Sequence, residues 1–262
     1  MVERDSTVSS YSGRHAELYD LFYGEKPYRQ EAEFVHSRIQ QFGMGDSRRL
    51  LELACGTGSH ALMLEELGYE VTATDYSIDM LQRARDKAAN RHSKVKFQMA
   101  DMRDLPAPDV GYDAVVCLFD SLGYVETNES LERVLRGVHR VLRKEGLLVV
   151  EFWHAAAMLK SYDPLRIRRW TTPDREIVRV AETKLDIPRQ VANVTYSVYE
   201  LKNDGSYSSF TETQGNRYFL VQEMAGWLSA CRLVPLKWYS GFTEDEDIGD
   251  HTWHVLAVAR SQ

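Results

Sequence analysis

The stretch LLELACGTGSHALML, residues 50–64, decides the fold. A short apolar run leads into Gly56 and Gly58, and apolar residues resume at helical spacing from Ser59. Glycine allows the backbone to turn tightly and approach a ligand, and the helix that follows points its amide groups at that ligand. The pattern therefore predicts a strand, a cofactor-binding turn and a helix, although a turn with a purely structural role would look the same.

The turn lacks one residue of the dinucleotide-binding fingerprint. Where the third glycine would stand, the sequence reads Gly-Thr-Gly-Ser-His, so tight helix packing under a pyrophosphate is not favoured. The turn still suits a cofactor whose polar end is an amino acid. We expect Glu52, near the end of the strand, to hold the ammonium group of that cofactor directly or through water.

Strands and helices alternate on both sides of this turn. Residues 16–41 carry apolar residues at helical spacing in two groups, which predicts two helices. Alternation of strands with helices implies a parallel sheet covered on both faces, with ligands beyond the carboxyl ends of the strands. The predicted strands begin at Arg49, Glu70, Val95, Tyr112 and Gly146, and the predicted helices span Ser59–Leu67, Ile78–Asn90 and Asn128–Leu142.

The pattern of polar and apolar residues changes after Leu159. Residues 160–220 alternate polar and apolar side chains, are rich in Val, Thr and Tyr, and contain a hairpin signal at KNDGS, residues 202–206. We expect an antiparallel β sub-domain inserted into a main domain of residues 1–159 and 221–262. A helix over 221–232 and two strands, LVPLKWYSGF and HTWHVLAVAR, complete the main domain.

Composition excludes several classes of protein. The chain has 262 residues, is 44% hydrophobic and carries a net charge of −7, which argues against nucleic acid as the main partner. We expect the basic cluster RIRRW, residues 166–170, to be a solvated face. Three widely spaced cysteines, a polar N-terminus and no long apolar run predict a soluble, cytoplasmic protein without a membrane segment.

Two aspartates follow the second and third predicted strands. Asp75 lies nineteen residues after Gly56, where a carboxylate can accept both hydroxyls of a ribose. Asp101 can accept a hydrogen of an adenine amino group while the amide of Met102 meets the edge of the ring. Either aspartate alone would be read as a cap or turn residue, but three such features on successive strands indicate a nucleoside-containing cofactor.

These stretches resemble class I S-adenosylmethionine-dependent methyltransferases. The resemblance rests on LELACGTGSH, VTATDYSIDML, ADMRDL and YDAVVCLFDSLGYV, in that order. It implies a doubly wound, Rossmann-like sheet of seven strands whose last strand is antiparallel, with S-adenosylmethionine as cofactor. By the same resemblance, Gly56 and Gly58 contact the methionine moiety, Asp75 the ribose, Asp101 and Met102 the adenine, Phe119 lies under the cofactor, and Tyr76 and Met80 adjoin it.

The methyl acceptor is expected beyond the fourth and fifth strands. Transfer from a sulfonium is an in-line displacement that needs alignment and a dry site, and a hydroxyl acceptor also needs a general base. Asp120, Tyr124, Glu151 and His154 are candidates, with Asp120, Tyr124 and His154 in catalytic roles. The alternative is that Asp120 caps the following helix and Tyr124 packs in the core.

Tyrosines in the N-terminal helices are spaced to close over such a site. We expect Tyr19 and Tyr28 to contact the cofactor and Tyr23 to contact the acceptor, since aromatic faces attract a sulfonium. Ordinary packing of these rings against the sheet is the alternative.

A narrower resemblance is to N,N-dimethyltransferases that act on nucleotide-linked amino sugars. It implies that Glu151, Trp153 and Arg217 face the acceptor, with Arg217 suited to a phosphate, and that the inserted sheet serves sugar binding and dimerisation. This chain has Tyr124 where those enzymes have histidine, which leaves the acceptor open.

The main hypothesis is therefore methyl transfer to a small-molecule amine. The alternatives are an O-methyltransferase with a general base and a cofactor-binding regulator without catalysis; a dehydrogenase is less favoured because of the missing glycine. No metal is expected, because His251 and His254, three apart in a predicted strand, would point to opposite faces.

Overall fold

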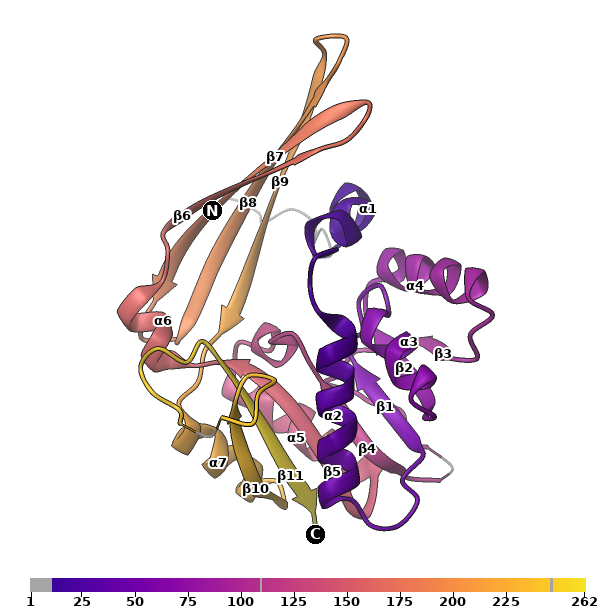
Figure 1. The fold of residues 1–262 in the computed structure, drawn as a ribbon. Coiled ribbons are helices and arrows are strands. Elements are labelled where there is room, and N and C mark those ends of the chain that lie inside the picture. The colour runs from indigo at the N-terminus through magenta and orange to yellow at the C-terminus, as the bar shows by residue number, and fades with distance from the viewer. Residues whose placement is uncertain (1–10, 109, 246) are drawn as a thin grey trace, which may run out of the picture.

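A seven-stranded sheet forms the body of the protein (Figure 1). The computed structural model describes residues 11–108, 110–245 and 247–262, so most of the polar N-terminal stretch lies outside the described residues. The strand order is β10-β11-β5-β4-β1-β2-β3, and β11 runs antiparallel to both of its neighbours. The strands are β1 (Arg49–Leu53), β2 (Glu70–Asp75), β3 (Lys96–Met99), β4 (Tyr112–Cys117), β5 (Leu142–Trp153), β10 (Leu233–Ser240) and β11 (His254–Ser261).

Helices cover both faces of this sheet, which confirms the doubly wound fold class predicted from the sequence. Alternate residues of β1 reach opposite cores: Leu51 and Leu53 pack with helices α5 and α7, and Leu50 packs with α2, α3 and α4. The helices are α1 (Gly13–Phe22), α2 (Tyr28–Phe42), α3 (Ser59–Glu66), α4 (Ile78–Asn90), α5 (Asn128–Val141), α6 (Ala155–Ser161) and α7 (Val221–Ala230). Local signals set two of the starts, since Ser77 and Thr127 accept backbone hydrogen bonds as N-caps of α4 and α5.

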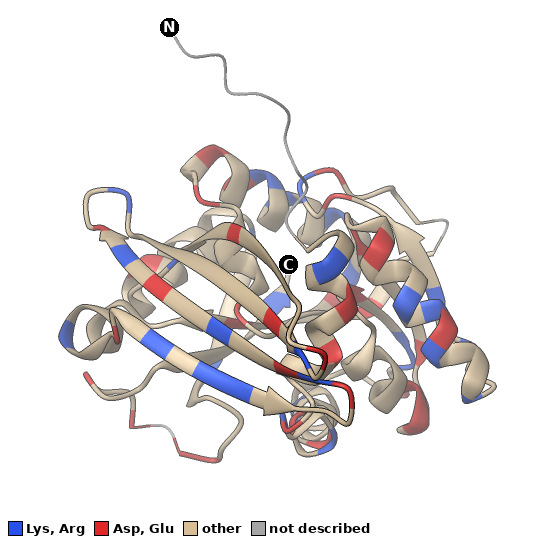
Figure 2. Cartoon of the chain, turned by 90° about the horizontal axis from the view of Figure 1, so that it is seen from above, with Lys and Arg blue, Asp and Glu red and all other residues tan. Residues whose placement is uncertain are grey.

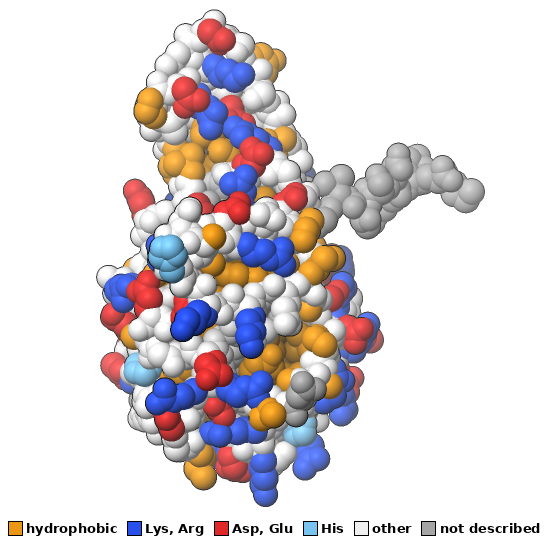
Figure 3. Space-filling model, turned by 90° about the vertical axis from the view of Figure 1, so that its right-hand side faces the viewer, with side chains coloured by type: hydrophobic (Ala, Val, Ile, Leu, Met, Phe, Trp, Pro, Cys, Tyr) orange, Lys and Arg blue, Asp and Glu red, His pale blue; other side chains and the backbone are white. Residues whose placement is uncertain are grey.

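A separate antiparallel sheet rises from one end of the body. Its strands follow the order β6 (Leu165–Thr171), β7 (Arg175–Asp186), β8 (Val191–Lys202) and β9 (Tyr207–Arg217). The hairpin expected at residues 202–206 is confirmed, with the amide of Lys202 donating to the carbonyl of Ser206. In the space-filling view this sheet belongs to a narrower lobe above the body (Figure 3). We call it the lid sheet.

Some details differ from the sequence-based expectations. Helix α6 and a 3₁₀ turn, η1 (Ser121–Tyr124), are present where none was expected, and β5 begins at Leu142 rather than Gly146. His251 precedes β11 and lies in a turn, so the argument that placed His251 and His254 on one strand was wrong. Across the described residues, every helix is too short or too polar to cross a membrane.

Candidate active site

The glycine turn after β1 adopts a conformation that only glycine accepts without strain at two positions. Gly56 has φ +54° and Gly58 has φ +75°. A Cβ on Gly58 would lie 2.7 Å from the ring of Phe97, so the close packing of β3 and α4 also requires a glycine there. Asp75 fastens the turn from the end of β2: its Oδ2 accepts the amide of Gly56 at 2.8 Å, and its Oδ1 accepts the amide of Ser77 at 2.8 Å.

Glu52 lies in β1, just before this turn, and in the described part of the chain one oxygen of its buried carboxylate lacks the hydrogen-bond partner that such an atom usually has. The residue is 2% exposed, and Oε2 has no hydrogen-bond partner among the described residues. The nearest basic group is the Nδ1 atom of His60, 3.9 Å from Oε1. Burial, with a smaller contribution from the charge of Asp75, raises the pKa of Glu52 to about 8. An unpartnered buried acceptor beside a glycine turn fits the ammonium group of an amino-acid moiety.

The aspartates at the strand ends are already engaged. The Asp75 carboxylate accepts the amides of Gly56, Ser77 and Tyr76, and a carboxylate has about four acceptor positions, which leaves room for a ribose hydroxyl. Asp101 accepts the guanidinium of Arg103, and this pair lowers the pKa of Asp101. Met102 packs against the core, and Tyr76 is 43% exposed. These residues lie at the carboxyl edge of β2 and β3, where a nucleoside would be held.

Helix α1 covers the glycine turn with aromatic rings. Tyr19 is buried with Met80, and an ideal Cβ on Gly56 would lie 3.9 Å from the Tyr19 ring. The rings of Tyr19 and Tyr23 are 4.8 Å apart, and Tyr23 meets Phe119 edge to face at 5.1 Å. The sequence thus identified residues that the structure gathers into one cluster over the turn.

Two further tyrosines lie near this cluster. Tyr28, at the start of α2, packs edge to face on His60 at 4.9 Å, and it is not among the residues that line the large cavity described below. Tyr11, which sequence reasoning missed, hydrogen-bonds through its hydroxyl to the hydroxyl of Tyr124. Because Tyr11 precedes the helical pattern, no periodic signal marked it.

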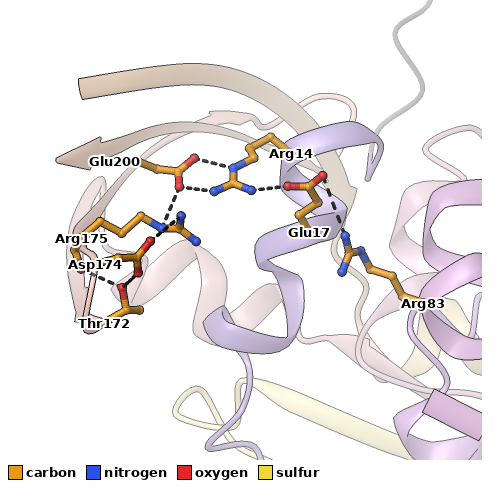
Figure 4. A network of polar contacts seen from close by, with 7 residues as sticks. All are labelled: Arg14, Glu17, Arg83, Thr172, Asp174, Arg175 and Glu200. Atoms are coloured by element: carbon orange, nitrogen blue, oxygen red, sulfur yellow. Dashed lines mark hydrogen bonds and ion pairs between the residues drawn. The ribbon is translucent and has the colours of Figure 1, made fainter. Parts of the chain in front are cut away.

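Ion pairs hold α1 between the lid sheet and α4 (Figure 4). Arg14 pairs with Glu200 on β8, and the Nε atom of Arg175 lies 3.1 Å from the same carboxylate. On the other side, Arg83 of α4 reaches Glu17 of α1 at 4.0 Å. These contacts position the aromatic residues of α1 over the glycine turn.

The turn that follows β4 is strained. Phe119 and Asp120, two consecutive non-glycine residues, have φ values of +57° and +56°. Such conformations cost about 1–3 kcal/mol each and are concentrated at functional sites. Glu151 of β5 stabilises this turn, because its Oε2 accepts the amide of Phe119 at 2.5 Å.

Three ionisable side chains meet beside this turn. Nδ1 of His254 lies 3.0 Å from Oδ2 of Asp120 and 3.2 Å from Oε1 of Glu151. Both carboxylates are buried, at 3% and 2% exposure. Burial and the neighbouring Glu151 raise the pKa of Asp120 to about 6, although His254 opposes the shift. Burial alone would lower the pKa of His254, but the two carboxylates raise it to about 11.

This cluster carries net negative charge at neutral pH. His254 is an imidazolium, Asp120 is largely ionised, and both face the same space as Glu151. Their ligand atoms lie within 4.8 Å of one another, as in a site for a cation. With His254 protonated, its imidazole has no free lone pair for a metal, and the cluster in that state suits an organic cation.

A cavity of about 1060 Å³ lies between the strand ends and the lid sheet. Its size is that of a ligand site. In the space-filling view, hydrophobic side chains gather where the lobe meets the body (Figure 3). The lining includes six of the residues predicted from the sequence: Tyr23, Phe119, Asp120, Tyr124, Glu151 and Trp153.

Two of the residues predicted for the acceptor site lie outside the cavity. His154 follows Trp153 and takes the opposite direction, so it lines a smaller pocket with Trp238 and Ile248. Arg217 is buried outside the cavity and pairs with Glu223 at 2.7 Å. The expectations that His154 faces the acceptor and that Arg217 holds its phosphate are therefore corrected, because side chains alternate along β5 and β9.

Other residues line the cavity in place of His154 and Arg217. On β9, Gln214 and Asn216 line the cavity, and the side-chain amide of Asn216 donates to the carbonyl of Asp120 at 3.3 Å. Gly123 permits this approach, since a Cβ there would lie 2.7 Å from the carbonyl oxygen of Arg217 and would overlap the Asn216 side chain.

Comparison with known proteins gives the family context. Residues 50–146 match a family described as a methyltransferase domain. A Bacillus subtilis (strain 168) protein named as a methyltransferase, YqeM, is 29% identical over 88% of this chain and 90% of its own length. The dTDP-3-amino-3,4,6-trideoxy-alpha-D-glucopyranose N,N-dimethyltransferase of Streptomyces venezuelae is 32% identical over 55% of this chain and 59% of its own length.

The fold is also shared with solved structures. CalS10 of Micromonospora echinaspora, an amino pentose methyltransferase with S-adenosylmethionine bound, superposes with a TM-score of 0.76 at 22% identity. The alignment covers 98% of this chain and all of that one. By its matched domain, its relatives and its Rossmann-like methyltransferase fold, the chain is an S-adenosylmethionine-dependent methyltransferase.

Proposed function

We propose that this enzyme methylates a small-molecule amine in the cavity beneath the lid sheet. The observation that carries the proposal is the buried cluster of Asp120, Glu151 and His254, whose net negative charge faces the cavity. A negative cluster attracts an ammonium group, whereas a phenol or alcohol would gain little from it. The named N,N-dimethyltransferase and amino pentose methyltransferase relatives support the same acceptor chemistry.

The residues of the glycine turn fit the cofactor. Glu52 would hold the ammonium group of S-adenosylmethionine, Asp75 the ribose, and Asp101 with Met102 the adenine. When bound, S-adenosylmethionine supplies an electrophilic methyl group on a positively charged sulfur. The buried ring of Tyr19 and the partly buried ring of Phe119 exclude water and offer aromatic faces to that charge.

Asp120 is the residue suited to accept the proton of the amine. Amines are largely protonated near neutral pH, and a protonated nitrogen has no lone pair with which to attack. A carboxylate whose pKa lies near 6 is matched to removing that proton at the working pH. His254 is already protonated and instead keeps Asp120 ionised. Tyr124, whose pKa burial raises well above its usual value, stays neutral and positions the acceptor.

The acceptor is, in our proposal, an amino sugar linked to a nucleotide. The cavity volume of about 1060 Å³ exceeds what a simple alkylamine would fill, and the named relative acts on a dTDP-linked amino sugar. The O-methyltransferase alternative is disfavoured because a neutral hydroxyl would gain little from the charge of the Asp120, Glu151 and His254 cluster.

Binding and turnover measurements test this function in order. Calorimetry with S-adenosylmethionine, S-adenosylhomocysteine and NAD should show binding of the two sulfur cofactors only. Labelled methyl transfer should then be measured on simple amines, amino sugars, nucleotide-linked amino sugars and phenols. Turnover of a phenol with failure of every amine would overturn the amine proposal.

We also infer a homodimer formed through the lid sheet. The face of this sheet turned away from the cavity exposes Leu165, Ile167, Tyr199, Leu201 and Tyr207. Exposed apolar clusters of this kind are typical of interaction surfaces. Sedimentation should give a dimer for the wild type and a monomer for Ile167→Glu; a monomeric wild type would contradict the inference.

Localisation in the cytoplasm is a further expectation. Cys55, Cys117 and Cys231 are all free and buried, as is usual for proteins of a reducing compartment. Fractionation of cells that express the native protein would test it.

A further inference from the structure

A group of arginines lines the cavity on the side of the lid sheet. Arg166 and Arg168 of β6 and Arg179 of β7 are all cavity residues. Figure 2, which looks down on the molecule, shows basic residues recurring along strands of this sheet. Arg166, Arg168 and Arg169 are exposed, as the sequence-based expectation of a solvated face at residues 166–170 requires, and they also line the cavity.

Arg179 is the most informative of the three. It is only 7% exposed, and its guanidinium carbon lies 4.6 Å from the ring centroid of Phe22, 5.1 Å from Trp170, 5.2 Å from Tyr196 and 5.4 Å from Tyr23. Its hydrogen bond is a long one, 3.5 Å to the hydroxyl of Tyr23. Within the described ranges no carboxylate pairs with it. A buried charge without a counterion is costly, and aromatic faces offset only part of that cost.

The neighbours of Arg179 add positive charge. Arg168 is its direct cross-strand partner, and Arg166, two residues along, points to the same face of β6. Side chains in directly opposite positions lie about 4.5–5.5 Å apart at Cβ, where like charges destabilise a sheet. In the described part of the chain, the exposed side chains of Arg166 and Arg168 have no hydrogen bond or ion pair.

Other arginines near the lid sheet have carboxylate partners. Arg14 and Arg175 share the carboxylate of Glu200 (Figure 4). Arg169 pairs with Glu176 at 3.0 Å. Arg169 also lines the cavity and is paired, whereas Arg166, Arg168 and Arg179 have no carboxylate partner among the described residues. This contrast indicates that a ligand supplies the missing negative charge.

We propose that Arg166, Arg168 and Arg179 form a subsite for a phosphoryl group of the methyl acceptor. Three adjacent guanidinium groups exceed the single charge of a carboxylate and match a group with two or more charges. Their planar forks of N–H donors suit phosphoryl oxygens. The cavity would therefore recognise a molecule with an amine at the Asp120 end and a phosphate or diphosphate at the lid. This assignment deepens the proposed function and rests on it for the amine.

Binding of inorganic pyrophosphate to the full-length protein tests the subsite without requiring turnover. Calorimetry at constant ionic strength should detect pyrophosphate binding to the wild type, and Arg168→Gln and Arg179→Gln should each weaken it about tenfold or more. Arg189→Gln is the matched control, because Arg189 lies in the turn between β7 and β8, outside the cavity, and pairs with Glu126. Its affinity for pyrophosphate should stay within twofold of the wild type.

Thermal unfolding shows whether an arginine variant is still folded. Arg179→Met removes an unpaired buried charge, so we expect an equal or higher Tm without ligand and loss of the Tm rise that pyrophosphate produces in the wild type. Undiminished pyrophosphate binding in the arginine variants, no binding to the wild type, or equally tight binding of acetate would each overturn the phosphoryl subsite. Failure of methyl transfer to amines with intact pyrophosphate binding would instead count against the proposed function.

Discussion

Nδ1 of His254 lies 3.0 Å from Oδ2 of Asp120, although 134 residues separate them in the chain. The contact joins the first residue of β11 to the strained turn after β4. It places a cation beside a buried carboxylate and thereby opposes the rise in the pKa of Asp120 that burial causes. Two predictions follow from this pair.

Asp120→Asn should abolish most of the activity without loss of cofactor binding. Asparagine keeps an oxygen for the hydrogen bond from His254 but cannot take a proton from the amine. We expect kcat to fall by about 10²- to 10⁴-fold, while the Kd for S-adenosylmethionine changes by less than about twofold. Asp250→Asn, an exposed aspartate paired with Lys160, serves as the control and should leave kcat unchanged. A kcat for Asp120→Asn within twofold of the wild type would exclude Asp120 as the base.

His254→Gln should shift the pH dependence of the reaction. Activity needs ionised Asp120, so kcat/KM of the wild type should rise with pH through a midpoint near 6. Removal of the imidazolium takes away a charge that lowers the pKa of Asp120, so the midpoint should move to higher pH. His251→Gln, an exposed histidine in the preceding turn, should keep the wild-type profile. Identical profiles for His254→Gln and the wild type would contradict the coupling.

Glu52→Gln should remove a pH dependence of cofactor binding. The pKa of Glu52 near 8 means that the carboxyl is largely protonated at pH 6 and must lose its proton to hold an ammonium group. Affinity for S-adenosylmethionine should therefore rise with pH between 6 and 7.5, by up to about tenfold per unit, since one proton is released. Calorimetry in buffers of different ionisation enthalpy would count that proton. A wild-type affinity independent of pH would contradict the role of Glu52.

Glu52→Gln should also change the unliganded protein. A carboxyl whose folded pKa is raised contributes stability below its unfolded value of about 4.5, and this contribution is lost as the pH rises toward 8. The unfolding free energy of the wild type should therefore fall with pH over this interval more steeply than that of Glu52→Gln. Urea unfolding at pH 5 and pH 8 measures the difference.

Two glycine substitutions should act in opposite directions. Gly58→Ala introduces a Cβ at φ +75° and against Phe97, so the unfolding free energy should fall by about 1–3 kcal/mol. Gly226→Ala lies within α7, where an added Cβ meets nothing within 4 Å, and should raise the unfolding free energy by about 0.5–1 kcal/mol. Only Gly58→Ala should weaken cofactor binding; an unaffected Kd would separate the turn from the cofactor.

Local sequence patterns were enough for the main architecture. The spacing of apolar residues gave helix α4 with its observed ends, and the hairpin at 202–206 followed from its turn residues. Glycines and acidic residues at strand ends marked the cofactor edge, because φ preferences and capping are properties of a few neighbouring residues. The resemblance to known methyltransferases supplied the seventh strand and its direction.

The acceptor side depended on long-range pairing. The antiparallel register of β11 on β5 sets His254 opposite Trp153 and brings it to Asp120 and Glu151, and no local pattern encodes that register. A shift of one residue along a strand also exchanges its faces. Arg217, which the resemblance to amino-sugar N,N-dimethyltransferases placed at the acceptor, lies on the other face of β9 from Gln214 and Asn216.

The sequence by itself therefore determined the Rossmann-like fold, the inserted sheet and the edge where the cofactor is expected, since each depends on short-range periodicity and turn chemistry. Only the tertiary structure decided which charges share the cavity. The cluster of Asp120, Glu151 and His254 and the cross-strand pair of Arg168 and Arg179 exist because strand register and burial bring distant residues together. Burial then changes their electrostatics in ways that sequence spacing does not record.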